Sequence, residues 1–230
     1  MENVLLKVEN ARQWYSQKRN LTQLFTQKPK QWVKAVDDVS LTLRHGEVLG
    51  IIGESGCGKS TLGRMLAMLE RPFDGHLELD GQDYASIGKR DIRAFRRKVQ
   101  IVFQNPFETF DPRHDIENIL MQPLIIHNIG DSVENRRQII CDGLEKLGIT
   151  PAEDYLSRWP HELSGGQLQR ISVLRSMLLN PLLVIADEPV SMLDVSVRAD
   201  LLNILMSLVH EYHMAMVFIS HDIAVTNYVA

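Results

Sequence analysis

The sequence predicts an α/β fold in which a mostly parallel sheet carries helices on its faces, preceded by antiparallel strands and interrupted by a helical subdomain. Three observations lead to this prediction. Short apolar runs of strand length recur along the chain and alternate with helical patterns, as in parallel sheets. One of these runs passes directly into a glycine-rich loop and then a helix. A stretch from Asp115 to about Trp159 is helical in pattern throughout.

Length and composition are those of one ordinary globular domain. The chain has 230 residues, of which 44% are hydrophobic and 23% are charged. A formal net charge of −4 argues against a nucleic-acid binder. The two cysteines, Cys57 and Cys141, are too few for a disulfide framework or a thiolate metal site. No apolar run approaches the roughly 18 residues of a membrane span, and the first residues do not resemble a signal peptide, so we expect a soluble cytosolic chain.

The N-terminal part predicts antiparallel strands. Val4–Val8 and Val33–Leu43 alternate apolar and polar residues, which is the pattern of half-buried strands. The polar and basic residues 17–31 between them are interpreted as an exposed excursion. Leu77–Asp80 followed by Gly81 predicts a hairpin turn.

The strands of the parallel sheet are predicted from four apolar runs: Val48–Ile52, Gln100–Phe103, Leu182–Ala186 and Met216–Ile219. Helices are expected after the glycine-rich loop to about Leu69, over Lys89–Lys98, over Val197–Tyr212 and from near Asp222. The long helical stretch is expected to break at Gly130, Gly148 and Pro151. The sequence stops inside the last expected helix, so we expect a further part of the domain beyond Ala230.

The stretch GESGCGKST, Gly53–Thr61, matches the phosphate-binding pattern G-x-x-x-x-G-K-[ST]. It follows an expected strand and opens an expected helix, and backbone N–H groups at such a helix start bind phosphate oxygens. Lys59 is expected to reach the β- and γ-phosphates, and Ser60 to ligate Mg²⁺. Cys57 inside the loop is interpreted as a small filler and not as a nucleophile.

Polar side chains follow the other buried strands. Asp187 and Glu188 come at the end of LLVIAD, where Asp187 is suited to hold Mg²⁺ and Glu188 to act as general base on a water. His221 and Gln104 end two more strands of the same sheet. Spacing alone leaves alternatives open, since His221 could be a helix-start residue, Gln104 a plain loop amide and Asp222 a helix cap.

Two further features need an assignment. Trp14 and Tyr15 lie at the end of the first strand, and either ring could stack on a nucleobase or simply be half-buried. The stretch LSGGQLQR, Leu163–Arg170, is a second glycine-rich helix start, whose N–H groups and dipole suit an anion.

Together and in this order, these motifs resemble the ATP-binding subunit of ATP-binding-cassette (ABC) transporters over essentially the whole chain. GESGCGKS is similar to the family's Walker A, and LLVIAD followed by Glu188 to its Walker B. LSGGQ resembles the ABC signature, which separates this family from other P-loop proteins. Gln104 matches the Q-loop glutamine, SMLD with Asp194 the D-loop, and His221 the switch histidine.

The resemblance implies a P-loop NTPase fold with an ABC-type ATPase core, and ATP and Mg²⁺ as cofactors. The implied catalytic residues are Glu188, His221 and Gln104, and the implied metal ligands are Ser60, Gln104 and Asp187. Tyr15 is chosen as the aromatic residue that stacks on adenine. The other implied nucleotide contacts are Gly53, Glu54, Ser55, Gly56, Cys57, Gly58, Lys59, Ser60, Thr61, Ser164, Gly165, Gly166, Gln167 and Asp194.

A finer resemblance points to the branch of oligopeptide and dipeptide importer ATPases. It is carried by FQNPFETFDPR at Phe103–Arg113, DEPVSMLDVSV at Asp187–Val197 and FISHDIAV at Phe218–Val225. The chain departs from the branch at Asn105, where Asp is common, at Phe110–Asp111 in place of Leu-Asn, and at Leu168, a position usually basic or polar.

The resemblance also implies partners. A second ABC ATPase subunit, identical or different, is expected to dimerise head to tail with this one, so that Ser164 and Gly166 approach the γ-phosphate held by the facing chain. Two membrane-spanning permease subunits are expected as partners, and this chain is expected to be peripheral, at the cytoplasmic face of the membrane. An external substrate-binding protein would act indirectly, and no nucleic acid is expected.

The implied function is ATP hydrolysis that powers import, with oligopeptides or dipeptides as the first choice of cargo. The branch also contains importers of nickel and of oligosaccharides. A soluble non-transport ABC ATPase and a nucleotide-binding module without turnover stay open as other classes. Residues 1–104 and 181–230 are expected to form the nucleotide-binding core, and residues 105–180 the Q-loop and helical signature subdomain.

Overall fold

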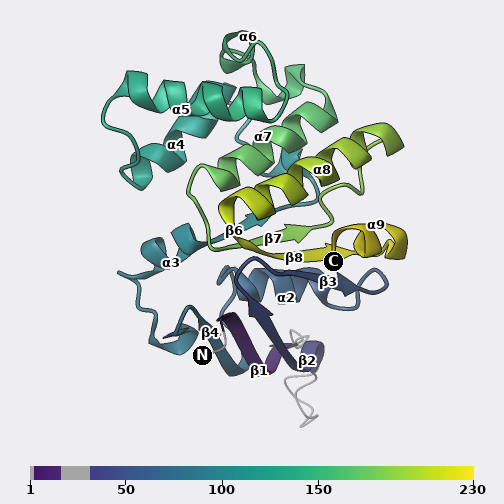
Figure 1. The fold of residues 1–230 in the computed structure, drawn as a ribbon. Helices are drawn as coiled ribbons and strands as arrows, with labels where there is room; N and C mark the ends of the chain where they lie inside the picture. The colour runs from purple at the N-terminus through teal and green to yellow at the C-terminus, as the bar shows by residue number, and fades with distance from the viewer. Residues whose placement is uncertain (1–2, 17–31) are drawn as a thin grey trace, which may run out of the picture.

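The structure, a computed structural model, describes residues 3–16 and 32–230. The excursion expected at 17–31 lies outside the described residues. The described elements form layers, with one group of helices above a parallel sheet and a second group below it, next to an antiparallel sheet (Figure 1). The predicted α/β class with N-terminal antiparallel strands is confirmed.

The parallel sheet has four strands in the order β3-β8-β7-β6. They are β3 (Val48–Ile52), β6 (Val99–Val102), β7 (Leu183–Asp187) and β8 (Ala215–Ser220). All residues of β7 and β8 are buried. Burial on both faces explains why these strands read as continuous apolar runs in the sequence.

The antiparallel sheet has the order β2-β1-β4-β5. Its strands are β1 (Val4–Ser16), β2 (Trp32–Arg44), β4 (Asp74–Leu79) and β5 (Gln82–Asp83). The strand predicted over Val4–Val8 continues to Ser16, and Trp14 and Tyr15 lie near its end, as predicted. The pairing of β1 with β2 shifts register between Val8 and Ala11, where Asn10 has φ 51, and this irregularity interrupts the alternation that marks a strand in sequence.

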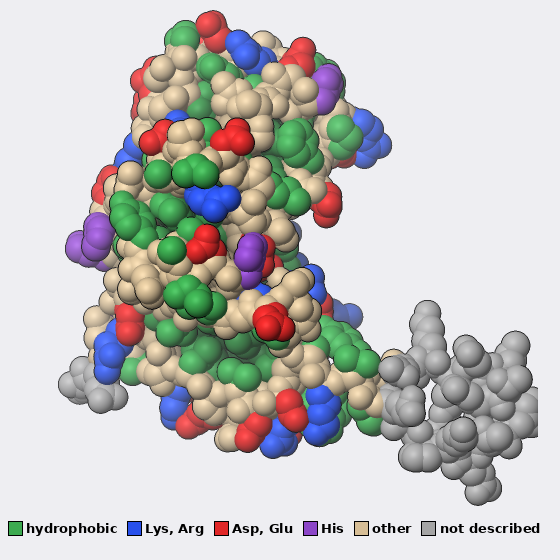
Figure 2. All heavy atoms as spheres, turned by 90° about the vertical axis from the view of Figure 1, so that its right-hand side faces the viewer, with side chains coloured by type: hydrophobic (Ala, Val, Ile, Leu, Met, Phe, Trp, Pro, Cys, Tyr) green, Lys and Arg blue, Asp and Glu red, His purple; other side chains and the backbone are tan. Residues whose placement is uncertain are grey.

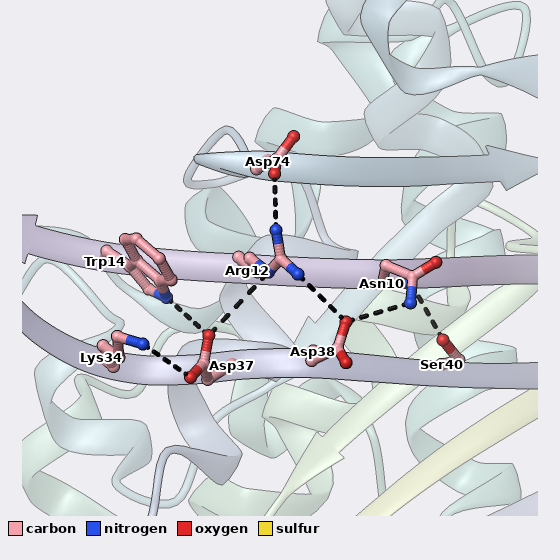
Figure 3. Close-up of polar contacts among 8 residues, drawn as sticks. All are labelled: Asn10, Arg12, Trp14, Lys34, Asp37, Asp38, Ser40 and Asp74. Carbon is pink, nitrogen blue, oxygen red and sulfur yellow. Dashed lines mark hydrogen bonds and ion pairs between the residues drawn. The ribbon is translucent and has the colours of Figure 1, made fainter.

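A polar network holds β1 to its two neighbours beyond this irregularity (Figure 3). Arg12 lies between acids on both sides, with Nη1 3.0 Å from Asp74 on β4 and Nη2 3.4 Å from Asp38 on β2. The amide of Asn10 donates to Asp38 at 3.0 Å, and the indole of Trp14 donates to Asp37 at 3.0 Å. Cross-strand side-chain contacts of this kind add to the strand pairing where the register shifts.

Helices cover both faces of the parallel sheet. Below it lie α2 (Lys59–Leu66) and α3 (Ile92–Lys98), and above it lie α4 (Ile116–Ile126), α5 (Val133–Lys146), α6 (Glu153–Leu156), α7 (Gly165–Met177) and α8 (Val195–Tyr212) (Figure 1). The last helix, α9 (Ile223–Val229), contacts β3 and β8. Short 3₁₀ turns are η1 (Tyr84–Ser86), η2 (Pro106–Glu108) and η3 (Pro160–Glu162). Helix α2 ends before the expected Leu69 and α3 begins after the expected Lys89.

Two hydrophobic clusters lie on opposite faces of the parallel sheet. One joins the buried residues of α4, α5, α7 and α8 to Val184, Ala186, Met216 and Phe218. The other joins α2, α3 and the antiparallel sheet to Leu183, Ile185, Val217 and Ile219. Successive residues of β7 and β8 therefore contribute to different clusters, as the pleat of a strand requires.

Among the described residues, none of the helices has both the length and the apolar character needed to cross a membrane.

Candidate nucleotide-binding site

The glycine-rich loop connects β3 to α2 and needs glycine for two reasons. Gly56 and Gly58 have φ 82 and φ 103, in the left-handed region that side chains disfavour. A Cβ built on Gly58 would also lie 1.9 Å from the carbonyl oxygen of Ala35 on β2. The antiparallel sheet therefore fixes the shape of the loop from outside, through a contact that admits no side chain at position 58.

Lys59 is the first residue of α2, and its ammonium is turned back onto the loop. Nζ donates to the carbonyl oxygens of Gly53 at 2.7 Å and of Glu54 at 2.8 Å. The side chain is buried, so these bonds keep the charge paired with acceptors. The ammonium is thereby held at the centre of the loop whose N–H groups would surround a phosphate.

Ser60 and Asp187 meet across the carboxyl ends of the strands. The Ser60 hydroxyl donates to Asp187 Oδ1 at 3.1 Å. Burial raises the pKa of the Asp187 carboxyl and the charge of Glu188 adds to this, while the bond from Ser60 opposes it. A hydroxyl beside a carboxylate forms an all-oxygen pair, which is the donor set that Mg²⁺ prefers.

Glu188 is held in an unusual backbone conformation. Its φ is 48, which is costly for a residue with a side chain, and its N–H donates to the carbonyl oxygen of Ile219 at 2.9 Å. Its Oε2 accepts a hydrogen bond from Gln104 Nε2 at 3.3 Å and lies 3.1 Å from His221 Nδ1, within ion-pair distance of that ring. The structure thus brings together three side chains that follow three different strands, β6, β7 and β8.

Two adjoining pockets lie over this group of residues. One, of about 290 Å³, is lined by the glycine-rich loop together with Ala35, Arg64, Gln104 and Glu188. The other, of about 610 Å³, is lined by the start of the loop with Gln104, Glu188, His221 and Ile223. Seen from the side that carries α8 and α9, the molecule is indented between its upper helical part and its lower sheet (Figure 2).

The side chains of Trp14 and Tyr15 make contacts in different parts of the structure. The Tyr15 hydroxyl donates to Glu70, just after α2, and burial followed by this bond raises the pKa of Tyr15. Trp14 stacks on Phe73 at a centroid distance of 5.2 Å and lies in the polar network of Figure 3. Tyr15 therefore lies on the side of α2, the helix that follows the glycine-rich loop, whereas Trp14 packs against Phe73.

The second glycine-rich stretch begins α7 but does not line either pocket. The Ser164 hydroxyl caps the helix by accepting from the N–H of Gln167 at 3.3 Å, and the Gln167 side chain accepts from the N–H of Ser164 at 3.0 Å. A Cβ on Gly166 would lie 2.6 Å from Val197 near the start of α8. Asp194 is the N-cap residue that precedes α8. Residues 163–167 and Asp194 are thus apart from the pocket residues within the described chain.

Comparison with known proteins identifies the family. The ABC transporter family matches residues 36–191. The chain belongs to that family.

Curated ABC relatives match most of this chain. The dipeptide transport ATP-binding protein DppF of Haemophilus influenzae is 45% identical over 98% of this chain and 67% of the relative. DppF of Escherichia coli is 47% identical over 88% of the chain and 60% of the relative. The oligopeptide transport ATP-binding protein AppF of Bacillus subtilis is 43% identical over 86% of this chain and 60% of the relative. The chain thus spans about 60 to 67% of the length of these relatives.

Solved ABC cassettes share the fold. The dimeric, post-hydrolysis state of the ATP-binding cassette MJ0796 bound to ADP and Pi has a TM-score of 0.84 at 27% identity, covering 98% of this chain and 91% of that one. A second dimeric structure of MJ0796, described as a bacterial ABC transporter cassette, has a TM-score of 0.81 with the same coverage and identity.

Three departures from the peptide-importer branch have structural reasons. Leu168 is fully buried in the helical cluster. The Asn105 side chain accepts from the N–H of Phe107 at 3.1 Å and caps η2. Phe110 is buried, with its ring 4.9 Å from the guanidinium of Arg175. Each residue suits its position, so the departures do not disturb the pockets.

Sequence reasoning missed Ala35, Arg64 and Glu70. Ala35 lies on β2, far from the loop in sequence, and no local pattern signals that its carbonyl would press on Gly58. Arg64 lines the smaller pocket one helical turn after Ser60, and a spacing of four on α2 could have found it. Glu70 holds Tyr15, an interaction that only the packing of β1 against α2 creates.

Proposed function

We propose that this chain binds and hydrolyses ATP and powers peptide import through a membrane ABC transporter. The observation that carries this proposal is the convergence of Lys59, the Ser60–Asp187 pair and the Glu188 group on adjoining pockets. The peptide class is supported by the relatives, whose names describe dipeptide and oligopeptide transport. The same names favour peptides over nickel or oligosaccharides, and transport over a soluble role.

Different residues of the chain would bind the phosphates, hold Mg²⁺ and accept the proton of the attacking water. Lys59 and the loop N–H groups would bind the β- and γ-phosphates. Ser60, Asp187 and Gln104 would hold Mg²⁺, which neutralises phosphate charge when bound. Glu188 would accept the proton of the attacking water, while His221 orients the carboxylate and the γ-phosphate. Phosphoryl transfer depends on such positioning more than on covalent chemistry.

Specificity for ATP over other nucleotides would come from contacts with the adenine ring. Tyr15 offers a ring on the side of α2 that carries the phosphate loop, and stacking on adenine is its proposed role. Contacts along the loop from Gly53 to Thr61 would hold the phosphates.

Completion of the site requires a second ATPase subunit. Ser164, Gly165, Gly166 and Gln167 open a helix suited to an anion, but they lie apart from the pockets of their own chain. We propose that they reach the γ-phosphate bound by a facing subunit, with Asp194 at the same interface. The dimeric state of the MJ0796 structures supports this arrangement. Hydrolysis would then be coupled to closure of the dimer.

The membrane partners would dock beside the Q-loop, at the cytoplasmic face. A groove of about 310 Å³ there is lined by apolar residues, among them Phe110 and Ile119, and by polar or charged residues, among them Asp111, Gln122 and Arg175. Phe107 nearby is 50% exposed. An amphipathic segment of a permease subunit would match this mixed lining. We also propose that the helices from residue 105 to 180 form a subdomain distinct from the nucleotide-binding core.

The test is the substitution Glu188→Gln in the complex with the permease subunits. An amide oxygen can still accept from Gln104, so ATP should bind and the closed dimer should accumulate, while kcat falls by about 10²–10⁴-fold because the base is lost. Size-exclusion chromatography with Mg-ATP and a phosphate-release assay measure the two effects. The matched control is Glu145→Gln on the exposed face of α5. Normal turnover by the Glu188 variant would refute the role of Glu188 as base.

The cargo is tested by recovering the chain from membranes with its partners and identifying the molecules held by the external binding protein. Peptides in that protein are the expected result. A metal ion or a sugar there would overturn the peptide assignment.

A further inference from the structure

Helix α7 carries a line of buried polar side chains that the proposed mechanism does not use. Gln169, Ser172 and Ser176 are each at most 3% exposed. Their spacings of three and four residues put them on one face of the helix. This face packs against β6 and η2, the strand and turn on either side of Gln104. Buried polar groups of this kind need hydrogen-bond partners, and the partners show what the face is for.

Gln169 is attached to the residue that precedes Gln104. Its Nε2 donates to the carbonyl oxygen of Phe103 at 3.1 Å. Gln104 follows directly and donates to Glu188 at 3.3 Å. The helix that begins with Ser164 is therefore connected, through one side chain and one peptide unit, to the side chain that holds Glu188.

Arg175 makes a second attachment to the same segment. Its Nη1 donates to the carbonyl oxygen of Thr109 at 3.2 Å, and its guanidinium lies 4.9 Å from the ring centroid of Phe110. Burial lowers the pKa of Arg175. Within residues 3–16 and 32–230 it has no ion pair with a carboxylate, so its donors serve the backbone after Gln104 and not another charge.

Stability alone does not explain Gln169. Its Oε1 is buried and, in the part of the chain that the structure describes, accepts no hydrogen bond. A buried carbonyl oxygen without a donor disfavours folding. Methionine has nearly the same length and would fill the space without that cost.

We propose that Gln169 is a positioning residue that ties the signature helix to the segment Phe103–Phe110, so that Ser164–Gly166 and Gln104 move as one body. The proposal rests on the proposed function, because Ser164–Gly166 matter only if they complete a site on a facing subunit. Close-packed interiors transmit displacement with little compression. A partner that shifts the surface at Phe107 would thus shift the start of α7 as well.

The experiment compares Gln169→Met with the parent in the full transporter complex. Loss of one hydrogen bond between the helix and the Q-loop is worth about fivefold in the population of the aligned site, and kcat should fall by that factor or more. The KM for ATP should stay within about twofold, and the melting temperature should not fall. The matched control is Ser176→Ala, which removes a hydroxyl that donates to Ser172 in its own helix at 3.2 Å and to Ile101 on β6 only at the longer distance of 3.5 Å, and it should behave as the parent.

Hydrogen exchange on the same variants tests the attachment without hydrolysis. In Gln169→Met, the amides of residues 103–110 should exchange about fivefold faster than in the parent, while those of α7 keep their rates. Parent-like exchange overturns the proposal, whatever kcat does. Faster exchange also overturns the proposal if kcat is unchanged in a complex that hydrolyses ATP. A joint fall of melting temperature, ATP affinity and kcat overturns it as well, because a purely structural role would explain that result. A parent complex without ATPase activity would refute the proposed function instead, and exchange at residues 103–110 would still decide the attachment.

Discussion

Gly58→Ala should destroy the phosphate loop while leaving most of the fold intact. The added Cβ would meet the carbonyl oxygen of Ala35 at 1.9 Å, whereas real Cβ contacts under 3.0 Å essentially never occur. Either the loop or β2 must therefore move by about 1 Å. A displacement of about 1 Å in a catalytic site can cost about 10²-fold in rate, so kcat/KM should fall by at least that factor.

Stability should fall by a smaller and separable amount. The φ of 103 at Gly58 disfavours alanine by about 1–2 kcal/mol, and relief of the clash adds about 1–3 kcal/mol of packing strain. Gly81→Ala is the matched control, because Gly81 has φ 73 but no atom within 4 Å of an added Cβ. It should lose only the first amount and keep ATP affinity.

The assays are thermal unfolding and titration with a fluorescent ATP analogue, followed by phosphate release in the assembled complex. The reasoning fails if Gly58→Ala binds ATP with the affinity of the parent while its melting temperature matches that of Gly81→Ala. That result would mean that β2 moves aside at little energetic cost and does not determine the shape of the glycine-rich loop.

Three further predictions follow from single contacts. Tyr15→Ala should weaken ATP binding about 5- to 100-fold through loss of base stacking, whereas Trp14→Ala should leave it unchanged in the same titration; the opposite pattern would move the stacking role to Trp14. Burial, and secondarily Arg97 and Arg93, lowers the pKa of His127, so its stabilising contribution is complete above about pH 6.5 and is lost as pH falls through the folded-state pKa. His127→Gln should therefore reduce the drop in melting temperature between about pH 7.5 and about pH 5, and an unchanged drop would contradict this. The isolated chain should bind ATP as a monomer but hydrolyse it slowly, with a rate per chain that rises with concentration; a concentration-independent rate as fast as that of the dimer would contradict the shared site.

The sequence predicted the parallel strands closely because their burial leaves a strong pattern. Val48–Ile52 was expected and observed with the same bounds, and β7 and β8 differ from expectation by one residue at most at each end. Asp222, one of the open alternatives, does cap α9, since its side chain accepts from the N–H groups of Ala224 and Val225. The expected breaks at Gly130 and Gly148 fall between helices.

The features that the sequence could not predict depend on contacts between segments that are far apart along the chain. The full length of β1 depends on Arg12 and its acidic neighbours on two other strands, which no window along the chain displays. The motifs indicated which side chains gather at the strand ends. They could not indicate that Gln104 and His221 share one oxygen of Glu188, because that geometry depends on the relative placement of three strands.

The two clusters on opposite faces of the parallel sheet have a consequence for how such a chain can change over evolutionary time. Side chains of β7 and β8 that point up never touch those that point down, so a volume change on one side is absorbed there. The parallel sheet separates the two hydrophobic clusters from each other. Substitutions among the upper helices can therefore accumulate without repacking the lower cluster, which includes residues of α2 next to the glycine-rich loop.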